Sequence, residues 1–255
     1  MKNKFLYIFF FFILLTLIFL NMESSRYTGI NYIVTEEKIS NLKKIKEFYK
    51  RYNNYKKLVE TITVDLDKYN QIIKISEWIY LNINKKKIND ITVDSHPWTI
   101  VERRIGAKDQ FSDLLSVLLV VNNIDSFFIS KINDTGPLTF FKFNDSWSVI
   151  DPYYGLYFLN FKNEFCSLDE LKLNNCIFVH FKYEEISDDE INFIFNDKNF
   201  KNIFELKNFY NSMFQKIPSA IDIENTNIYL RGGRSYVQKP LHRLIYQFKK
   251  SLNLF

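Results

Sequence analysis

The longest hydrophobic run in the chain lies near its N-terminus, where Phe5 to Leu20 is interrupted only by Tyr7 and Thr16. Lys2 and Lys4 precede the run, and a basic start before an apolar stretch is typical of a segment that engages a membrane. Its sixteen residues fall between the roughly 7–15 of a cleaved signal peptide and the roughly 20 of a spanning helix. The length alone therefore leaves both interpretations open.

The residues after this segment favour an uncleaved anchor. Residues 21–25 contain no pair of small residues at the Ala-x-Ala spacing that a signal peptidase cuts. Lys2 and Lys4, with no acidic residue near them, place the N-terminus in the cytoplasm by the positive-inside rule. The sequence thus predicts a single-pass protein of the inner (cytoplasmic) membrane with an extracytoplasmic domain. A secreted or periplasmic protein, released by cleavage, is the alternative.

Two helices are predicted next, because apolar positions recur every three or four residues. The first runs from Glu36 to about Thr61 and is strongly basic on its outer face. The second runs from Asp67 to about Ile83. It ends in the polar stretch Asn84 to Asn89, which we interpret as a solvated loop.

In the middle of the chain the pattern changes from helix to strand. Gly106 precedes an almost wholly apolar stretch that stops at Asn122, and with Asp109 as a candidate cap this predicts a buried central helix. Short aromatic and β-branched runs follow, separated by turn-forming residues, and they predict an antiparallel meander. These runs are Phe127–Ile129, Leu138–Phe143, Trp147–Ile150, Tyr157–Leu159 and Ile177–Phe181.

Together these elements predict an α+β fold with N-terminal helices, a buried central helix and an antiparallel sheet. The chain is 47% apolar with six Gly and five Pro, so we expect one packed domain after the N-terminal segment. The expected divisions are a membrane segment at 1–20, a helical N-terminal region at 21–66, a core at 67–217 and a basic C-terminal segment at 218–255.

Two stretches of this core resemble the transglutaminase-like superfamily, whose fold is papain-like. The first is Lys-Asp-Gln-Phe-Ser-Asp-Leu-Leu at residues 108–115, which opens the central helix. The second is Trp-Ser-Val-Ile-Asp-Pro-Tyr-Tyr-Gly at residues 147–155, which ends the second strand of a hairpin. The resemblance covers residues 72–161, about a third of the chain.

In that family, a cysteine at the start of the central helix is the nucleophile. A histidine on the first hairpin strand is the base, and an aspartate on the second strand orients it. Carried over by position, the nucleophile falls on Lys108 and the base near Gly136, where residues 134–139 contain no histidine. Only the acid is kept, as Asp151. An amine would form a stable amide with an acyl group, so the resemblance implies a catalytically inactive member.

The groove of such a member would then serve for binding. Lys108 either pairs with Asp151 across the space of the missing imidazole or turns outward at the helix N-terminus. His96, just ahead of the central helix, either contributes to the site or forms hydrogen bonds within its loop. The expected groove residues are Lys108, Asp109, Gln110, Trp147, Asp151 and His96.

The cysteines and the remaining histidines are weaker candidates. Cys166 and Cys176 either form one disulfide in an exported chain or remain two buried thiols. Cys166 precedes a capping-box pattern at Ser167, and with no histidine nearby in sequence we favour a packing role. His180, in an aromatic strand, is interpreted as structural and His242 as solvated or interfacial. Two Cys and three His give no recognisable ligand spacing, so no metal or cofactor is expected.

The formal net charge of +5 comes from the two ends of the chain, because residues 21–224 are net negative. The last 31 residues hold six Arg or Lys and no acid. Leu241 to Phe255 has an apolar stripe, which predicts an amphipathic helix that docks on its own domain, lies on an anionic membrane or binds an acidic polymer. Nucleic acid is not an expected partner of an exported domain. The candidate anion-binding residues are Arg231, Arg234, Lys239 and Arg243.

The resemblance thus suggests a membrane-anchored, inactive transglutaminase-like protein that acts as a binding or scaffold module in a bacterial cell envelope. Its partner would be a protein or a surface polysaccharide. The alternative is a cysteine protease or amidase of the same type with a displaced nucleophile.

Overall fold

The computed structural model describes residues 2–30, 33–87, 96–129, 136–183, 186–195, 200–225 and 245. The chain forms two compact units. One comprises residues 1–54, 87–95 and 240–255, and the other comprises residues 55–86 and 96–239. The groove residues predicted from the sequence fall in the second unit. The predicted anion-binding residues lie outside the described residues: Arg231, Arg234, Lys239 and Arg243. His242 and the predicted helix Leu241–Phe255, except for Ile245, also lie outside them.

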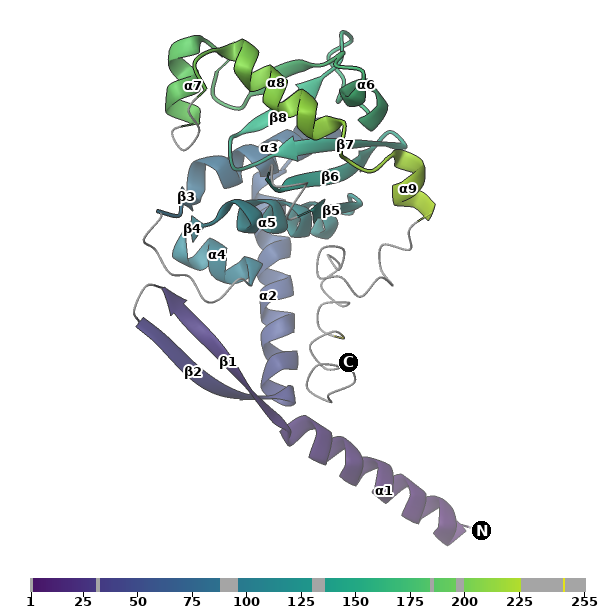
Figure 1. Ribbon diagram of the computed structural model, residues 1–255. Coiled ribbons are helices and arrows are strands. Elements are labelled where there is room, and N and C mark those ends of the chain that lie inside the picture. Colours follow the sequence, from purple (N-terminus) through teal and green to yellow (C-terminus); the bar gives the residue numbers. More distant parts are fainter. Residues whose placement is uncertain are drawn as a thin grey trace. The chain divides into compact units, whose positions relative to one another are not determined.

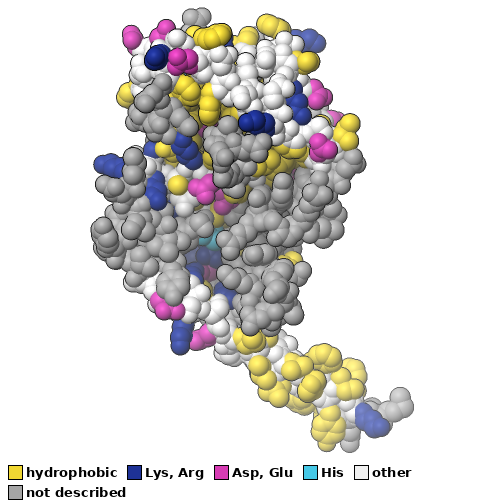
Figure 2. Space-filling view, viewed as in Figure 1, with side chains coloured by type: hydrophobic (Ala, Val, Ile, Leu, Met, Phe, Trp, Pro, Cys, Tyr) yellow, Lys and Arg dark blue, Asp and Glu magenta, His cyan; other side chains and the backbone are white. Residues whose placement is uncertain are grey.

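The first unit begins with the helix α1 (Lys2–Asn21; Figure 1). Its apolar side chains are exposed (Figure 2). Among the described residues it is the one helix long and apolar enough to cross a membrane, a property that a signal sequence shares. Its polar side chains bond to its own backbone, because the Thr16 hydroxyl donates to the Phe12 carbonyl and the Asn21 amide donates to the Leu17 carbonyl. These two bonds leave the Thr16 and Asn21 side chains paired on the apolar surface of the helix.

A β-hairpin follows α1, where the sequence had predicted helix from Glu36. Strands β1 (Glu23–Ile30) and β2 (Ile33–Ser40) pair antiparallel, and the helix α2 (Asn41–Ile62) begins only afterwards. The β-branched residues at 33–35 favour a strand. Ile39 happens to lie in phase with the apolar residues of α2, and this extended the helical period falsely. The 21–66 region is therefore not wholly helical.

An ionic network joins the hairpin to α2. The Arg26 guanidinium on β1 lies 2.9 Å from the Glu37 carboxylate on β2 and 2.7 Å from that of Glu47 on α2. Arg51 lies 3.1 Å from the same Glu47 carboxylate, and Lys43 pairs with Glu37. A network of partly buried charges fixes geometry better than isolated surface pairs.

The second unit contains the predicted core (Figure 1). Its helices are α3 (Lys68–Asn82), α4 (Pro97–Arg103), α5 (Lys108–Val121), α6 (Leu168–Lys172), α7 (Asp188–Ile194), α8 (Ile203–Phe214) and α9 (Ala220–Asn225). Its short strands β3 (Asn84–Lys85) and β4 (Ile105–Gly106) pair parallel. The meander is β5 (Ser126–Ile129), β6 (Leu138–Phe143), β7 (Ser146–Asp151), β8 (Leu156–Leu159) and β9 (Ile177–His180), which forms an antiparallel sheet in chain order.

The α+β fold, the buried central helix and the antiparallel meander are thus confirmed. Helix α3 is capped by Asp67, whose side chain accepts from the Asn70 N–H, and it ends at Ile83 as predicted. Helix α5 is capped at Ala107 and not at Asp109, because the chain already turns into the helix at Lys108. The Gln110 side chain accepts from the Ala107 N–H and from Arg103, at 3.0 and 2.7 Å, and this holds the helix start.

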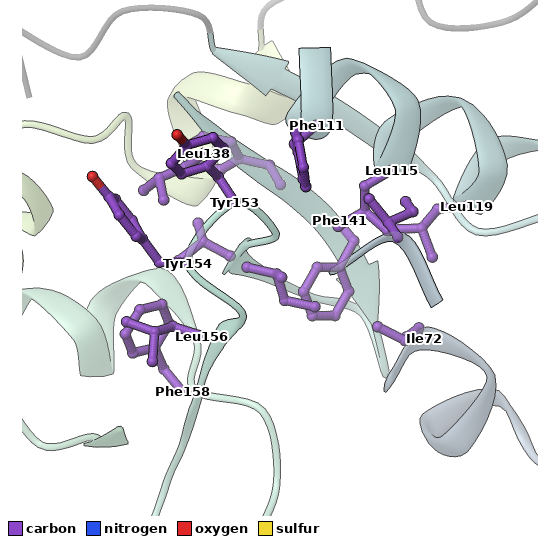
Figure 3. Packing of buried hydrophobic residues seen from close by; sticks show 14 of the residues in the cluster. Ile72, Phe111, Leu115, Leu119, Leu138, Phe141, Tyr153, Tyr154, Leu156 and Phe158 are labelled. Carbon is purple, nitrogen blue, oxygen red and sulfur yellow. The ribbon is translucent and has the colours of Figure 1, made fainter. Parts of the chain in front are cut away.

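The sheet lies between two layers of helices. On one face, the Thr139 hydroxyl donates to the Ser112 carbonyl of α5 over 3.1 Å. On the other face, the Phe158 ring packs against Tyr210 and Phe214 of α8. Figure 3 shows Phe111, Leu115 and Leu119 of α5 directed into this core, together with Phe141 of β6. The core contains many aromatic side chains, each of which removes a large area from water.

The stretch from Asn84, predicted as a solvated loop, starts as a strand. Asn84 pairs with Ile105, and the Lys86 N–H donates to the Gly106 carbonyl over 2.8 Å. The strand is polar, and its two residues are too few to show alternation. The pairing could therefore not be predicted from the sequence. The pairing brings Lys85 beside the start of α5.

Candidate functional site

The acid carried over from the resemblance, Asp151, lies at the centre of a set of hydrogen bonds. It ends β7 and is only 6% exposed. Its Oδ1 accepts from the N–H groups of Tyr153 and Tyr154, each at 3.1 Å, and its Oδ2 accepts from the Tyr210 hydroxyl at 2.7 Å. Burial raises the pKa of Asp151, while these hydrogen bonds and the nearby ammonium groups of Lys108 and Lys85 act in the opposite direction.

Lys108 stands at the first helical position of α5, the position to which the resemblance assigns a cysteine. Its ammonium donates to the Tyr154 hydroxyl and lies 4.7 Å from the centre of that ring and 5.2 Å from that of Tyr153. Among the described residues no ion pair joins it directly to Asp151. The predicted Lys108–Asp151 pair is therefore replaced by a connection through Tyr154, whose hydroxyl binds the amine and whose N–H binds the carboxylate.

A second lysine shares these rings. Lys85 places its ammonium 4.8 Å from the Tyr153 ring centre and 5.1 Å from that of Tyr154, and it donates to the Ile194 carbonyl over 3.0 Å. Two cations over adjacent aromatic faces are individually favourable through the ring quadrupoles. The four residues Lys85, Lys108, Tyr153 and Tyr154 are hereafter called the lysine–tyrosine cluster. The Tyr153 and Tyr154 rings are labelled in Figure 3.

The base position carries no titratable side chain. Thr139 pairs with Ile150, so one step further along the register brings Leu138 opposite Asp151. Leu138 is fully buried in the core. Gly136, the centre of the range predicted from spacing, has no heavy atom within 4 Å of the place its Cβ would take.

A histidine does lie on the same side of the sheet, two strands from β7. Asp151 pairs with Leu156 and Leu156 pairs with His180, so the three side chains share one face. His180 is 3% exposed, and its Nδ1 accepts from the Lys182 N–H over 3.0 Å. Its Nε2 makes no hydrogen bond of ordinary geometry within the described residues.

The environment of His180 keeps it neutral. Burial lowers its pKa from 6.5 to about 4, and the positive charge of Lys85 contributes in the same direction. Its ring stacks on Tyr183 and meets Tyr80 edge to face. Gly155 leaves room for this ring, because a Cβ there would lie 3.0 Å from the His180 Nε2. These contacts fit the structural role expected from the sequence.

The other predicted groove residues are dispersed. Asp109 is exposed, whereas Gln110 is buried and holds the start of α5. Trp147 lies in the core, with its ring centre 5.3 Å from that of Phe127. His96 caps α4, since its Nδ1 accepts from the Trp98 N–H over 3.2 Å. This matches the loop hydrogen-bonding alternative for His96.

The cysteines of the chain, Cys166 and Cys176, form a disulfide, with their Cα atoms 6.3 Å apart. The bond encloses α6, whose N-cap Ser167 makes the predicted capping box with Glu170. Cys166 is buried and follows β8, so its packing role is confirmed and its role as a free thiol is not. Among the described residues, no group of three or more His, Cys, Asp or Glu side chains is placed to hold a metal ion.

Sequence reasoning found Asp151 and Lys108 but missed their partners. Tyr153 and Tyr154 belonged to the quoted stretch, yet their roles depend on the turn after β7. Lys85 and Tyr210 are 23 and 102 residues from Lys108 in the chain, and no local pattern links them. Only the order of the sheet and helices brings these residues together.

Comparison with known proteins finds distant likeness in structure alone. No family model matches the chain, and no curated protein matches it. A search of solved structures finds a protein described as a putative cysteine protease from Cytophaga hutchinsonii, with 15% identity and a TM-score of 0.35. The match covers 51% of this chain and 42% of that one, so it spans less than half of the relative's length.

Proposed function

We propose that the protein is a membrane-anchored, extracytoplasmic and catalytically inactive member of the transglutaminase-like superfamily that acts as a binding module. The observation that carries the proposal is the state of its sulfur: the chain has two cysteines, and both are consumed in one disulfide. The helix start that would bear the nucleophile bears Lys108 instead, with its amine held by Tyr154. No thiolate is then available for acyl transfer.

The order of elements supports the family assignment. A buried helix, then a strand, then a hairpin whose second strand ends in Asp151 is the arrangement that the resemblance implies. The position opposite Asp151 is filled by Leu138. Leucine cannot act as a base, and here it packs into the core. A protein that no longer needs a base can tolerate such a residue.

The junction after α1 supports an uncleaved anchor. The Asn41 N–H donates to the Met22 carbonyl over 3.0 Å, and the Asn41 side-chain amide donates to the Phe19 carbonyl over 2.9 Å. Carbonyls at the end of a helix have no partner within the helix, and an unpaired one is costly near lipid. Cleavage after Leu20 would remove one of these bonds and leave the buried Asn41 amide without its acceptor.

The disulfide also supports export, because such bonds persist in oxidising compartments and are rare in the cytosol. The domain would then stand on the outer side of the membrane, where a protein or an envelope polysaccharide is the partner. The surface around the lysine–tyrosine cluster and the basic C-terminal residues are the proposed binding elements.

The test uses the full chain in lipid nanodiscs without reductant. We expect no labelling by iodoacetamide, no hydrolysis of amide substrates and no incorporation of a fluorescent amine into a glutamine-rich protein. The Cys166→Ser/Cys176→Ser variant serves as the control and should behave identically. An activity that the wild type shows and this variant lacks would establish the displaced-nucleophile cysteine enzyme instead.

A further inference from the structure

The hydrogen bonds of Asn41 fix the depth at which α2 begins. They tie the first residue of α2 to Phe19 and Met22, at the end of the proposed membrane helix. Asn41 is fully buried, so this junction excludes water as well as pairing the carbonyls. The first turn of α2 therefore lies at the same level as the end of α1, although 20 residues separate them in sequence.

The apolar part of α1 is shorter than a bilayer core. Sixteen residues, Phe5 to Leu20, span about 24 Å at the helical rise, whereas the hydrocarbon layer is about 30 Å thick. A short span draws its flanking residues toward the lipid. Two apolar side chains at the junction are exposed and could contact the lipid: Met22 is 37% exposed and Leu42 is 40% exposed.

Basic residues of α2 follow directly on its exposed face. Lys46 and Lys50 are four residues apart and both exposed, and neither forms an ion pair with a described residue. Tyr49 lies between them in sequence and is 62% exposed. Side chains on a helix lean toward its N-terminus, so both ammonium groups lean toward the Asn41 end.

The other two lysines in these turns, Lys43 and Lys44, already contact other side chains. Lys43 pairs with Glu37, and Lys44 is buried with its ammonium 3.1 Å from the Asn41 side-chain oxygen. Burial lowers the pKa of Lys44. Lys46 and Lys50 are thus the lysines of the first three turns left to meet an external anion.

We propose that the first three turns of α2 form a lipid-binding surface, in which Lys46 and Lys50 bind the phosphates of anionic phospholipids and Leu42 and Tyr49 enter the interface. The ammonium groups lie within reach of the headgroup layer, because Lys46 and Lys50 stand about 7.5 and 13.5 Å beyond Asn41 along the helix axis. Tyrosine and lysine are the side chains that favour this layer. The proposal rests on the membrane anchor proposed above.

The test measures retention of phosphatidylglycerol against phosphatidylcholine by native mass spectrometry of the full chain in mild non-ionic detergent. We compare the wild type with Lys46→Gln/Lys50→Gln. The control, Lys162→Gln/Lys207→Gln, removes the same charge from exposed positions of the second unit. We expect the wild type and the control to prefer phosphatidylglycerol. The α2 variant should bind it on the order of thirtyfold more weakly, since each of the two lysines near an anionic surface contributes about fivefold. Equal binding by all three proteins overturns the proposal.

A second measurement does not depend on charge variants. A bimane label on Leu42→Cys, with the native disulfide kept oxidised, is placed in nanodiscs whose lipids carry a headgroup nitroxide. Quenching relative to nitroxide-free discs is expected, and its absence contradicts the proposed depth. Intact mass of the protein extracted from its own membranes separates the two proposals: loss of about 20 residues refutes the anchor, whereas a full-length chain without lipid preference refutes only the lipid-binding surface.

Discussion

At the residue scale, the most densely hydrogen-bonded acid of the candidate site is Asp151. Asp151 accepts three hydrogen bonds from Tyr153, Tyr154 and Tyr210, which join the turn after β7 to α8. A buried carboxylate with two lysines nearby is usually retained for chemistry or for specificity of folding. Since Leu138 lies opposite it on β6, we attribute to Asp151 the role of fixing the lysine–tyrosine cluster.

The first prediction concerns the pH dependence that Asp151 confers. Burial raises its pKa in the folded state, so between the ordinary value and the raised one the folded chain binds more protons than the unfolded chain. The free energy of unfolding should therefore fall as pH rises through that window, and Asp151→Asn should remove this slope. Denaturant unfolding followed by tryptophan fluorescence from pH 4 to 8 measures it.

Asp151→Ala serves as the comparison, because it also leaves the Tyr210 hydroxyl and two N–H groups without an acceptor. It should lose about 1–3 kcal/mol relative to Asp151→Asn at every pH. An unchanged slope in Asp151→Asn would show that another group titrates.

His180 gives the second prediction, with the opposite sign. Its pKa is lowered to about 4, so between pH 6.5 and about 4 the unfolded chain binds a proton that the folded chain does not. The stability that this difference provides is present above pH 6.5 and is lost as pH falls toward 4. His180→Phe keeps the aromatic contacts with Tyr80 and Tyr183 and should abolish the loss. Thermal melts at pH 4.5 and 7 compare the proteins with and without His180→Phe. Both carry Asp151→Asn, so that the titration of Asp151 does not contribute. If the protein that keeps His180 is equally stable at both pH values, the assignment to His180 is contradicted.

At the scale of elements, long periodic segments were predictable and short paired ones were not. The apolar stretch of α5 and the alternating strands from β5 to β9 were recognised, because burial of one or both faces dictates their pattern. The hairpin β1–β2 and the β3–β4 pair were missed. Each of these strands is fixed by its partner strand, as Glu23 is by Ser40 and Asn84 by Ile105. The apolar and polar pattern within one strand does not identify that partner.

The third prediction concerns the disulfide around α6. Joining Cys166 to Cys176 closes a short loop and restricts the unfolded chain. Cys166→Ser/Cys176→Ser should reduce the free energy of unfolding by about 2–3 kcal/mol, as for loops of this size. Equilibrium unfolding with and without reductant measures it. Reductant should lower the stability of the wild type and leave the variant unchanged, and a variant as stable as the oxidised wild type would refute the prediction.

At the scale of the whole molecule, the chain combines a helix suited to a membrane with a separate α+β unit. The sequence predicted both, and it predicted that Lys108 stands where a cysteine is expected. It did not predict what Lys108 binds, because Tyr154 reaches it only through the turn after β7. The contact of Asn41 with α1 also joins segments that are distant in the sequence, and it was not predicted. The proposed lipid-binding surface depends on this contact.

The last prediction tests the proposed ancestry of the second unit by building in the side chains that the resemblance assigns to a catalytic site. Lys108→Cys places a thiol at the N-terminus of α5, and Leu138→His places an imidazole opposite Asp151. If the fold is transglutaminase-like, the imidazole will lower the thiol pKa well below its usual value of about 8.5. The pH midpoint of iodoacetamide labelling in the double variant should then fall below that of Lys108→Cys alone. The matched control is Lys108→Cys/Lys162→His, which adds a histidine at an exposed position in the turn after β8 and should leave the midpoint unchanged. Equal midpoints in all three proteins would mean that Lys108 and Asp151 do not mark the two ends of a former catalytic triad, and the resemblance would then be one of sequence stretches alone.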